Sequence, residues 1–247
     1  MQIKTIKTEK ILPLKHNIFS LLDKYLVKMP ERSILAIASK IIAMCEGNVI
    51  KKGAEQKDDI AKREADYYLP DKLNNYGYML TIKDNILTPV AGIDESNGNG
   101  DYILWPHDPQ KSANDILDYL KKRFGRKEIG VIITDSKTTP LRWGTTGVAI
   151  AHSGFVPLRD YVGTPDIFGT KLRVTKSNIM DALAASAVLL MGEGSEQTPL
   201  ALIDDLPFIV WQDRHPTNKE LEDLKISIGD DLYAEILQSV EWQTKKP

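Results

Sequence analysis

Five short apolar runs, separated by segments with helical character, constrain the fold of this chain more than any other feature. They cover residues 33–39, 78–83, 129–135, 147–152 and 200–204. Each run is apolar and too short for a buried helix, so each predicts a β-strand. Several of these runs end in polar residues, where functional sites tend to lie. The pattern predicts a protein that mixes α-helix and β-sheet throughout.

Two helices are marked by their ends. The first has Asp108 as N-cap and Pro109 at the first helical position, then apolar residues at helical spacing until Gly125. The second runs from about Ser177 to Met191 and is rich in alanine. Its small side chains predict close packing against a neighbouring element.

The rest of the chain offers weaker signals. Residues 218–225 and 231–242 have amphipathic helical patterns, interrupted by an Ile-Gly pair. There is no repeat of fixed period, no low-complexity segment and no linker that divides the chain. Neither GxGxxG nor GxxxxGK[ST] occurs, so the common nucleotide-binding folds lack their signatures.

Composition limits the classes of function. A chain of 247 residues can bury a substantial core, as one large domain or as two interwoven small ones. The net charge of −2 offers no general attraction to nucleic acid or to an anionic membrane. Cys45 is the single cysteine, which excludes an intramolecular disulfide and suits a reducing compartment. The charged N-terminus has no apolar run after it, so we expect a cytoplasmic protein.

The turn at residues 91–97, AGIDESN, concentrates groups that bind hard cations. Asp94, Glu95, Ser96 and Asn97 follow one another directly. Their oxygen atoms are the kind that hold Mg²⁺ or Mn²⁺ and the phosphates it carries. The first hypothesis is therefore a metal-phosphate site. The alternative is an Asx-turn, in which the Asp94 side chain bonds its own backbone.

Two further carboxylates stand where a ligand could reach them. Asp135 and Ser136 close the apolar strand at residues 129–135, and Glu193 lies between two glycines after the alanine-rich helix. Asp135 would be a second metal ligand, whereas an isolated aspartate at a strand end is more commonly a cap or turn former. The alternative for the segment around Glu193 is an ordinary helix C-cap.

Two loops carry other candidates. Arg142 lies among hydroxyls and glycine, where a guanidinium can clamp a phosphate or carboxylate, or can instead stack on Trp143 at the surface. Asp160 and Asp166 flank a glycine in a segment that reads as a shaped loop rather than a helix. The histidines lack zinc spacing and no GxSxG motif occurs, so zinc, thiolate and α/β-type serine hydrolase chemistry are disfavoured.

Seven segments in collinear order resemble the coenzyme F-420:gamma-glutamyl ligase family. From about Leu12 to Glu193 they read SKIIAMCEG, AGIDESN, WPHDPQKSA, GVIITDS, RWGTTGVAIAHSG, DYVGTPDIFGTKL and LLMGEG. The resemblance implies an α+β fold with mixed sheets and helices in two interwoven subdomains, residues 1–247 forming one ligase-like domain, and a homodimer. A related branch, labelled as a folate-metabolism gamma-glutamate ligase, is similar too.

The resemblance also implies roles for individual residues. Metal ligation falls to Asp94, Asp135 and Glu193, with Ser136 in place of a threonine. Nucleotide contacts fall to Leu12, Pro13, Leu14, Lys15, Ser39, Lys40, Asn97, Gly192, Gly194 and Ser195. Three departures concern recognition: Met44 replaces a nucleotide-contacting lysine, for which Lys40 is a candidate substitute; Thr138-Thr139 replace a Gly-Arg pair; and Val90 replaces an asparagine.

Such a ligase uses GTP or ATP with Mg²⁺ or Mn²⁺ to join L-glutamate to a carboxylate acceptor, deazaflavin-like or folate-like, through an acyl phosphate. Arg142 would steady developing charge, and Asp160 or Asp166 would orient the attacking amine or take its proton. Two alternatives stay open: a non-catalytic nucleotide- or cofactor-binding protein of the same fold, and a ligase for a different amino acid.

Overall fold

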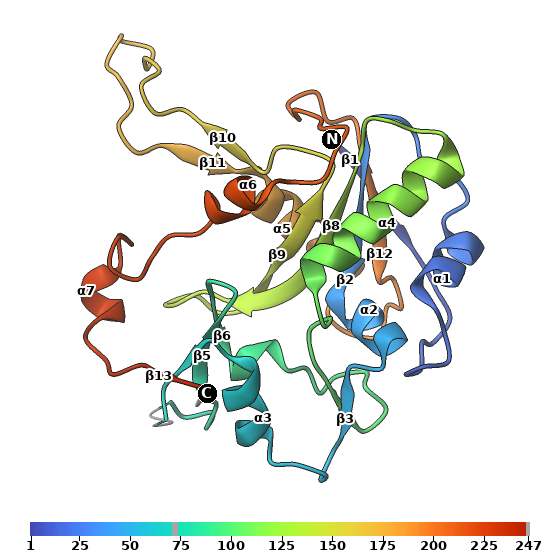
Figure 1. Cartoon of the computed structure of the whole chain (residues 1–247), viewed down its shortest axis with the longest axis vertical. Coiled ribbons are helices and arrows are strands. Elements are labelled where there is room, and N and C mark those ends of the chain that lie inside the picture. Colours follow the sequence, from blue (N-terminus) through green and yellow to red (C-terminus); the bar gives the residue numbers. More distant parts are fainter. Residues whose placement is uncertain (71–73, 246–247) are drawn as a thin grey trace.

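A five-stranded sheet organises the larger part of the molecule (Figure 1). The computed structural model describes residues 1–70 and 74–245. The strand order is β1 (Gln2–Ile6), β12 (Leu200–Asp204), β2 (Ser33–Ala38), β8 (Ile129–Thr138) and β9 (Thr145–Ser153). β2 and β8 are parallel, and the other neighbours are antiparallel. Four of the five strands expected from sequence lie here, and the fifth is β5 (Leu80–Lys83) of a second sheet.

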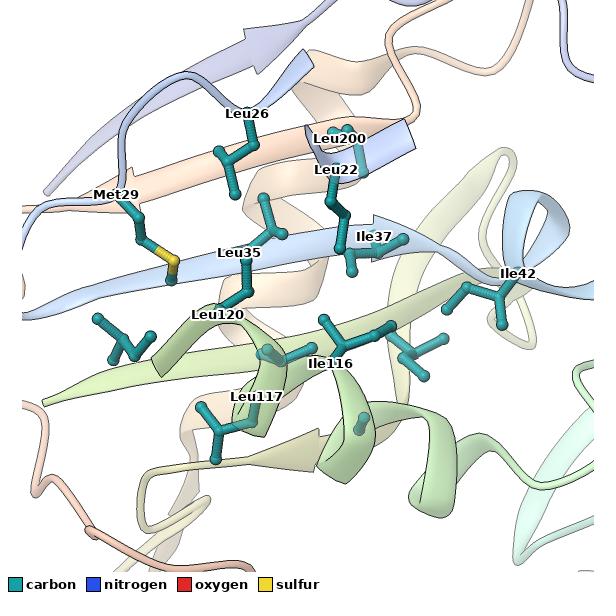
Figure 2. Packing of buried hydrophobic residues seen from close by; sticks show 14 of the residues in the cluster. Leu22, Leu26, Met29, Leu35, Ile37, Ile42, Ile116, Leu117, Leu120 and Leu200 are labelled. Carbon is teal, nitrogen blue, oxygen red and sulfur yellow. The ribbon is translucent and has the colours of Figure 1, made fainter. Parts of the chain in front are cut away.

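Helices cover both faces of this sheet. Leu35 and Ile37 of β2 pack with α1 (Ile18–Tyr25), α2 (Ser39–Glu46) and α4 (Pro109–Phe124), as Figure 2 shows. Ile34 and Ala36 point to the opposite face and pack with α5 (Ile179–Met191). The alternation follows from the two-residue period of a strand. Because both faces are buried, the strands read as continuous apolar runs in the sequence.

The ends of α4 and α5 are set by capping. Asp108 accepts a hydrogen bond from the Lys111 backbone N–H at 2.8 Å, and Gly125 adopts a left-handed φ of 62°, so the bounds expected for α4 are confirmed. α5 begins at Ile179 rather than near Ser177, because Asn178 caps it with a hydrogen bond from Asp181. The expected close packing is confirmed, since a Cβ at residue 147 would lie 2.5 Å from the Ala184 carbonyl oxygen.

A second unit is inserted between α2 and α4. It holds a four-stranded sheet in the order β13 (Gln243–Thr244), β4 (Tyr67–Tyr68), β5 and β6 (Ile86–Pro89), with α3 (Lys57–Glu64) and a core of its own. The strand pair β3 (Val49–Lys51) and β7 (Asp101–Ile103) and the short helix η1 (Val90–Gly92) complete it. Because the last strand of the chain returns to this sheet, the two units are interwoven, and the α+β expectation is confirmed.

Two segments extend beyond these units. The arm consists of β10 (Leu158–Asp160), β11 (Lys176–Asn178) and the intervening residues 161–175, and Figure 1 shows it projecting from the body. It is non-helical, as expected. The C-terminal segment holds only α6 (Asn218–Glu222) and α7 (Ala234–Leu237), shorter than the expected helices. Neither buries a residue, so packing does not extend them. Within the described residues, no helix is long and apolar enough to cross a membrane.

Candidate functional site

A cavity of about 480 Å³ lies at the carboxyl ends of the parallel strands β2 and β8. Neighbouring parallel strands end at the same edge of a sheet, which is where open α/β sheets commonly bind ligands. Eleven of the candidate residues line it: Leu12, Ser39, Lys40, Asp94, Asn97, Asp135, Ser136, Gly192, Glu193, Gly194 and Ser195. These residues come from five separate stretches of sequence, and only the tertiary fold brings them together.

The turn that carries Asp94 is tied to α2 by a lysine. The Lys40 ammonium lies 2.5 Å from Asp94 Oδ2 and donates to the Ser96 hydroxyl at 3.0 Å. Asp94 Oδ1 accepts from the Ser96 backbone N–H at 2.6 Å, so the Asx-turn is present as well. Burial acts to raise the pKa of Asp94, but the Lys40 charge and these hydrogen bonds outweigh it and lower that pKa. Asp94 therefore presents a carboxylate to the cavity at neutral pH.

Glu95 faces away from the cavity. Its carboxylate binds Lys52 and Lys57, each at 2.6 Å, and so links the turn to the segment after β3 and to α3. These ion pairs also lower the pKa of Glu95. Its role is to hold the turn in place.

Asp135 lies within a strand rather than at its end. β8 continues to Thr138, so the expected strand end at Asp135 is wrong. The continuation is stabilised by pairing with β9, and the register shifts between Ile133 and Thr134. The shift leaves Ile150 of β9 without a partner on β8. Thr134, Asp135 and Ser136 of β8 all line the cavity.

The half-buried Asp135 carboxylate accepts hydrogen bonds from one side chain and from the Ser136 backbone N–H. The Trp105 indole Nε1–H donates to its Oδ2. Desolvation raises the pKa of Asp135 to about 6, and the nearby negative charge of Asp94 acts in the same direction. Asp94 and Asp135 are thus close enough to repel each other, which is the electrostatic setting that a cation relieves.

Glu193 connects three segments at the cavity wall. Its Oε1 accepts from the Ser136 hydroxyl at 2.7 Å and from the Thr145 hydroxyl at 3.3 Å. Asn97 Nδ2 donates to the Gly194 carbonyl at 3.0 Å. Gly192 also ends α5, so the C-cap alternative holds together with a place in the cavity. Side chains from β8, β9 and the turn at 91–97 therefore meet the loop after α5.

The donor set of the cavity suits a hard divalent cation. Asp94, Asp135, Ser136 and Glu193 offer only oxygen atoms. No group of three or more His, Cys, Asp or Glu in residues 1–70 and 74–245 is gathered tightly enough to form a ready-made metal cluster. Mg²⁺ commonly binds in open sites of this kind, through one or two carboxylates, waters and the phosphates of a substrate. The Lys40 ammonium supplies the positive charge beside Asp94.

The other candidates lie elsewhere. Pro13, Leu14 and Lys15 precede α1 and are absent from the cavity lining. Arg142 lies in the exposed turn between β8 and β9. Asp160 and Asp166 lie in the arm.

The two arm carboxylates make local contacts. Asp160 accepts from the Val162 N–H at 2.8 Å and pairs with Lys176 at 3.4 Å. Asp166 accepts from two backbone N–H groups of its own loop. Within one chain these two residues shape the arm, and their catalytic role stays a prediction.

Several lining residues were missed from the sequence. Thr8, Lys10 and Gln197 line the cavity, and Thr145 and Trp105 contact its carboxylates. The last two stand inside quoted segments, in RWGTTG and WPHDP, so the motifs contained a signal. The first three lie outside any motif and are recognised only in three dimensions.

Comparison with known proteins identifies the family. A family model described as F420-0:Gamma-glutamyl ligase matches residues 2–205. The Coenzyme F420:L-glutamate ligase of Methanococcus maripaludis is 33% identical over 208 residues, which is 78% of this chain and 83% of that protein. That of Methanothermobacter thermautotrophicus is 34% identical over 191 residues, 71% of this chain and 75% of that protein. That of Methanosarcina mazei is 33% identical over 226 residues, 84% of this chain and 88% of that protein.

The sequence matches thus place the chain in a family of ligases. The chain belongs to the F420-0:gamma-glutamyl ligase family. The expectation drawn from the seven collinear segments is confirmed.

Proposed function

We propose that this protein adds L-glutamate to a small-molecule carboxylate acceptor in a reaction that consumes GTP or ATP and requires Mg²⁺ or Mn²⁺. Family membership supports the glutamate-adding ligase activity. The observation that carries the nucleotide and metal requirement is the meeting of Asp94, Asp135 and Glu193 in one cavity with Asn97 and Lys40. The names of the relatives favour an acceptor of the F420 type, and a folate-like acceptor is the alternative.

The proposed chemistry has two steps. An oxygen of the acceptor carboxylate attacks the γ-phosphorus of the nucleotide, the bridging P–O bond breaks, and an acyl phosphate and a nucleoside diphosphate form. The glutamate amine then attacks the acyl carbon, inorganic phosphate leaves, and the amine loses a proton as the amide forms. Activation is needed because joining a carboxylate to an amine in water is uphill. The product is an N-acyl glutamate, and it is a gamma-glutamyl amide where the activated carboxylate is the γ-carboxylate of a glutamate already joined to the acceptor.

The residues of the cavity would divide the work. Asp94, Asp135 and Glu193 would hold the metal, with Ser136 as a further oxygen donor. The metal, when bound, would neutralise phosphate charge and align the transferring group. Lys40 would contact phosphate in place of the lysine that Met44 replaces, and Asn97 would bind the nucleotide.

We propose that the protein acts as a homodimer. Its projecting segments carry large apolar side chains in water: Trp143 is 93% exposed, Ile167 92% and Phe168 87%. Ile167 and Phe168 are adjacent on the arm, and an exposed apolar patch of this kind marks an interaction surface. Arg142, Asp160 and Asp166 lie on the same segments, so in a dimer they would serve the pocket of the partner subunit rather than their own.

The test is turnover of the purified full chain with glutamate and a deazaflavin acceptor. We expect release of nucleoside diphosphate and phosphate that requires Mg²⁺ or Mn²⁺, glutamate and acceptor together. Asp94→Asn and Asp135→Asn should each abolish it. Asp115→Asn is the matched control, since Asp115 lies on the surface of α4 and pairs with Lys111. Full turnover in the first two variants would refute the assignment.

Two variations of the assay address the open alternatives. Parallel reactions with GTP and ATP identify the nucleotide, and mass spectrometry of the product identifies the amino acid added. Tight nucleotide binding without turnover across a panel of acceptors would instead support a binding protein of the same fold.

A further inference from the structure

Trp105 is buried between the second unit and the candidate metal site. It follows β7 directly and is 2% exposed. Its indole nitrogen donates to Asp135 Oδ2, and the Asn48 side chain donates to its backbone carbonyl at 2.6 Å. Trp105 therefore contacts the Asp135 carboxylate without lining the cavity itself.

The face of the ring is also held in this orientation, by a cation. The Lys83 ammonium lies 5.1 Å from the ring centroid, and its position is fixed by Glu64 at 2.9 Å. Lys83 is on β5 and Glu64 on α3, so both belong to the second unit. A cation over the face of an indole is attracted to it. The face and the polar edge of the ring are thus both constrained.

Gly92 permits the approach of the ring to Asp135. A Cβ at residue 92 would lie 2.3 Å from Trp105 Nε1 and 3.2 Å from Asp135 Oδ2. The φ of Gly92 is 71°, in the left-handed region that favours glycine. The turn that presents Asp94 is therefore also the turn that leaves room for the contact between Trp105 and Asp135.

We infer that Trp105 is a positioning residue for the Asp135 carboxylate, holding Oδ2 so that the remaining oxygen is aimed at a divalent cation in the cavity. This inference rests on the proposed function, because it assumes that Asp135 binds metal. Groups that hydrogen bond to metal ligands fix their orientation, and their loss typically weakens metal affinity about 10- to 100-fold. The second unit would thereby stabilise the site through Glu64, Lys83 and Trp105.

The experiment is Mn²⁺ binding to the full-length protein, measured as free Mn²⁺ by electron paramagnetic resonance with GDP present. Trp105→Phe keeps a ring but removes the donor. We expect its Mn²⁺ dissociation constant to rise about 10-fold or more. Turnover should recover at high Mn²⁺, so the change appears in the KM for metal more than in kcat. Trp242→Phe, at a tryptophan outside the cavity lining, is the control and should bind as the wild type does.

A second measurement does not depend on the folding of the Trp105 variant. In a ¹⁵N-resolved proton NMR spectrum the indole N–H signal of Trp105 should move on addition of Mg²⁺ with GDP and in Asp135→Asn, while that of Trp242, outside the cavity lining, should not. The positioning role would be overturned if Trp105→Phe bound Mn²⁺ as tightly as the wild type. It would also be overturned if the Trp105 indole signal moved neither with Mg²⁺ and GDP nor in Asp135→Asn. Either result would leave the proposed function standing. Failure of the wild type itself to bind Mn²⁺ would overturn the proposed function and this inference together.

Discussion

His152 makes the stability of this protein depend on pH in a calculable way. The side chain is 1% exposed at the end of β9, and neither ring nitrogen has a hydrogen-bonding partner among the described residues. Its ring packs edge-on against Phe155, with centroids 5.4 Å apart. Desolvation lowers the pKa of His152 from 6.5 to about 4, and the charge of Glu220 opposes this only in part.

The sign and size of the effect follow from linkage. The unfolded chain takes up a proton on this histidine near pH 6.5, whereas the folded protein does so only near pH 4. Between these values the unfolded state binds more protons, so the free energy of unfolding falls as the pH falls. Above pH 6.5 the group has no effect, and below about pH 4 the loss is complete, at about 3 kcal/mol.

The perturbation is His152→Leu, which removes the titrating group and keeps an apolar side chain. Urea unfolding of wild type and variant is measured at pH 7, 5.5 and 4 by fluorescence and circular dichroism, whose coincidence supports two-state analysis. The same carboxylates titrate in both proteins. The difference in the free energy of unfolding between wild type and variant therefore isolates the contribution of His152. We expect the variant to gain about 3 kcal/mol relative to wild type between pH 7 and 4.

The surface variant His107→Leu is the control for loss of a histidine. A difference between wild type and His152→Leu that stays constant from pH 7 to 4 would refute the argument that burial withholds the proton.

Three further outcomes are expected. Lys40→Met removes the ammonium beside Asp94, and steady-state kinetics should show the nucleotide KM raised about 10-fold, the size of one lost charge-assisted contact; an unchanged KM would contradict a role in phosphate binding. Gly147→Val forces a side chain against the Ala184 carbonyl, and urea unfolding should show a loss of about 1–3 kcal/mol, whereas a stability equal to wild type would count against the close packing of α5. Phe168→Asp places a charge on the exposed arm, and light scattering should detect monomers in place of dimers; a dimer that persists would exclude the arm from the interface.

Much of the fold could be predicted because its signals are local. The α4 helix has both ends encoded in neighbouring residues, Asp108 and Gly125, and its bounds agree with the structure. The apolar runs of β2 and β8 are long enough to indicate strands without their partners. The weakly patterned C-terminal segment was harder, because amphipathic spacing forms a long helix only when a surface is available to bury it.

The continuation of β8 past Asp135 shows a different limit. Residues 136–138 are polar and resemble a loop in sequence, yet they pair with the start of β9. Hydrogen bonding to a neighbouring strand decides their conformation, and the register shift that leaves Ile150 of β9 unpaired appears only when the two strands are aligned. The strands of the arm were also missed, since they are three residues each and carry little apolar pattern.

By itself the sequence determined the class of fold, the family and the group of residues most suited to a metal and a nucleotide. These properties can be read from residue types and short spacings, because helix capping, strand formation and ligand chemistry depend on atoms that are close in the sequence. Only the tertiary structure decided which of those residues meet: Asp94, Asp135 and Glu193 lie on one cavity, whereas Asp160 and Asp166 lie on the arm. It also revealed the contact of Trp105 with Asp135. Contacts between residues distant in sequence depend on how sheets and helices pack, and no local pattern records that.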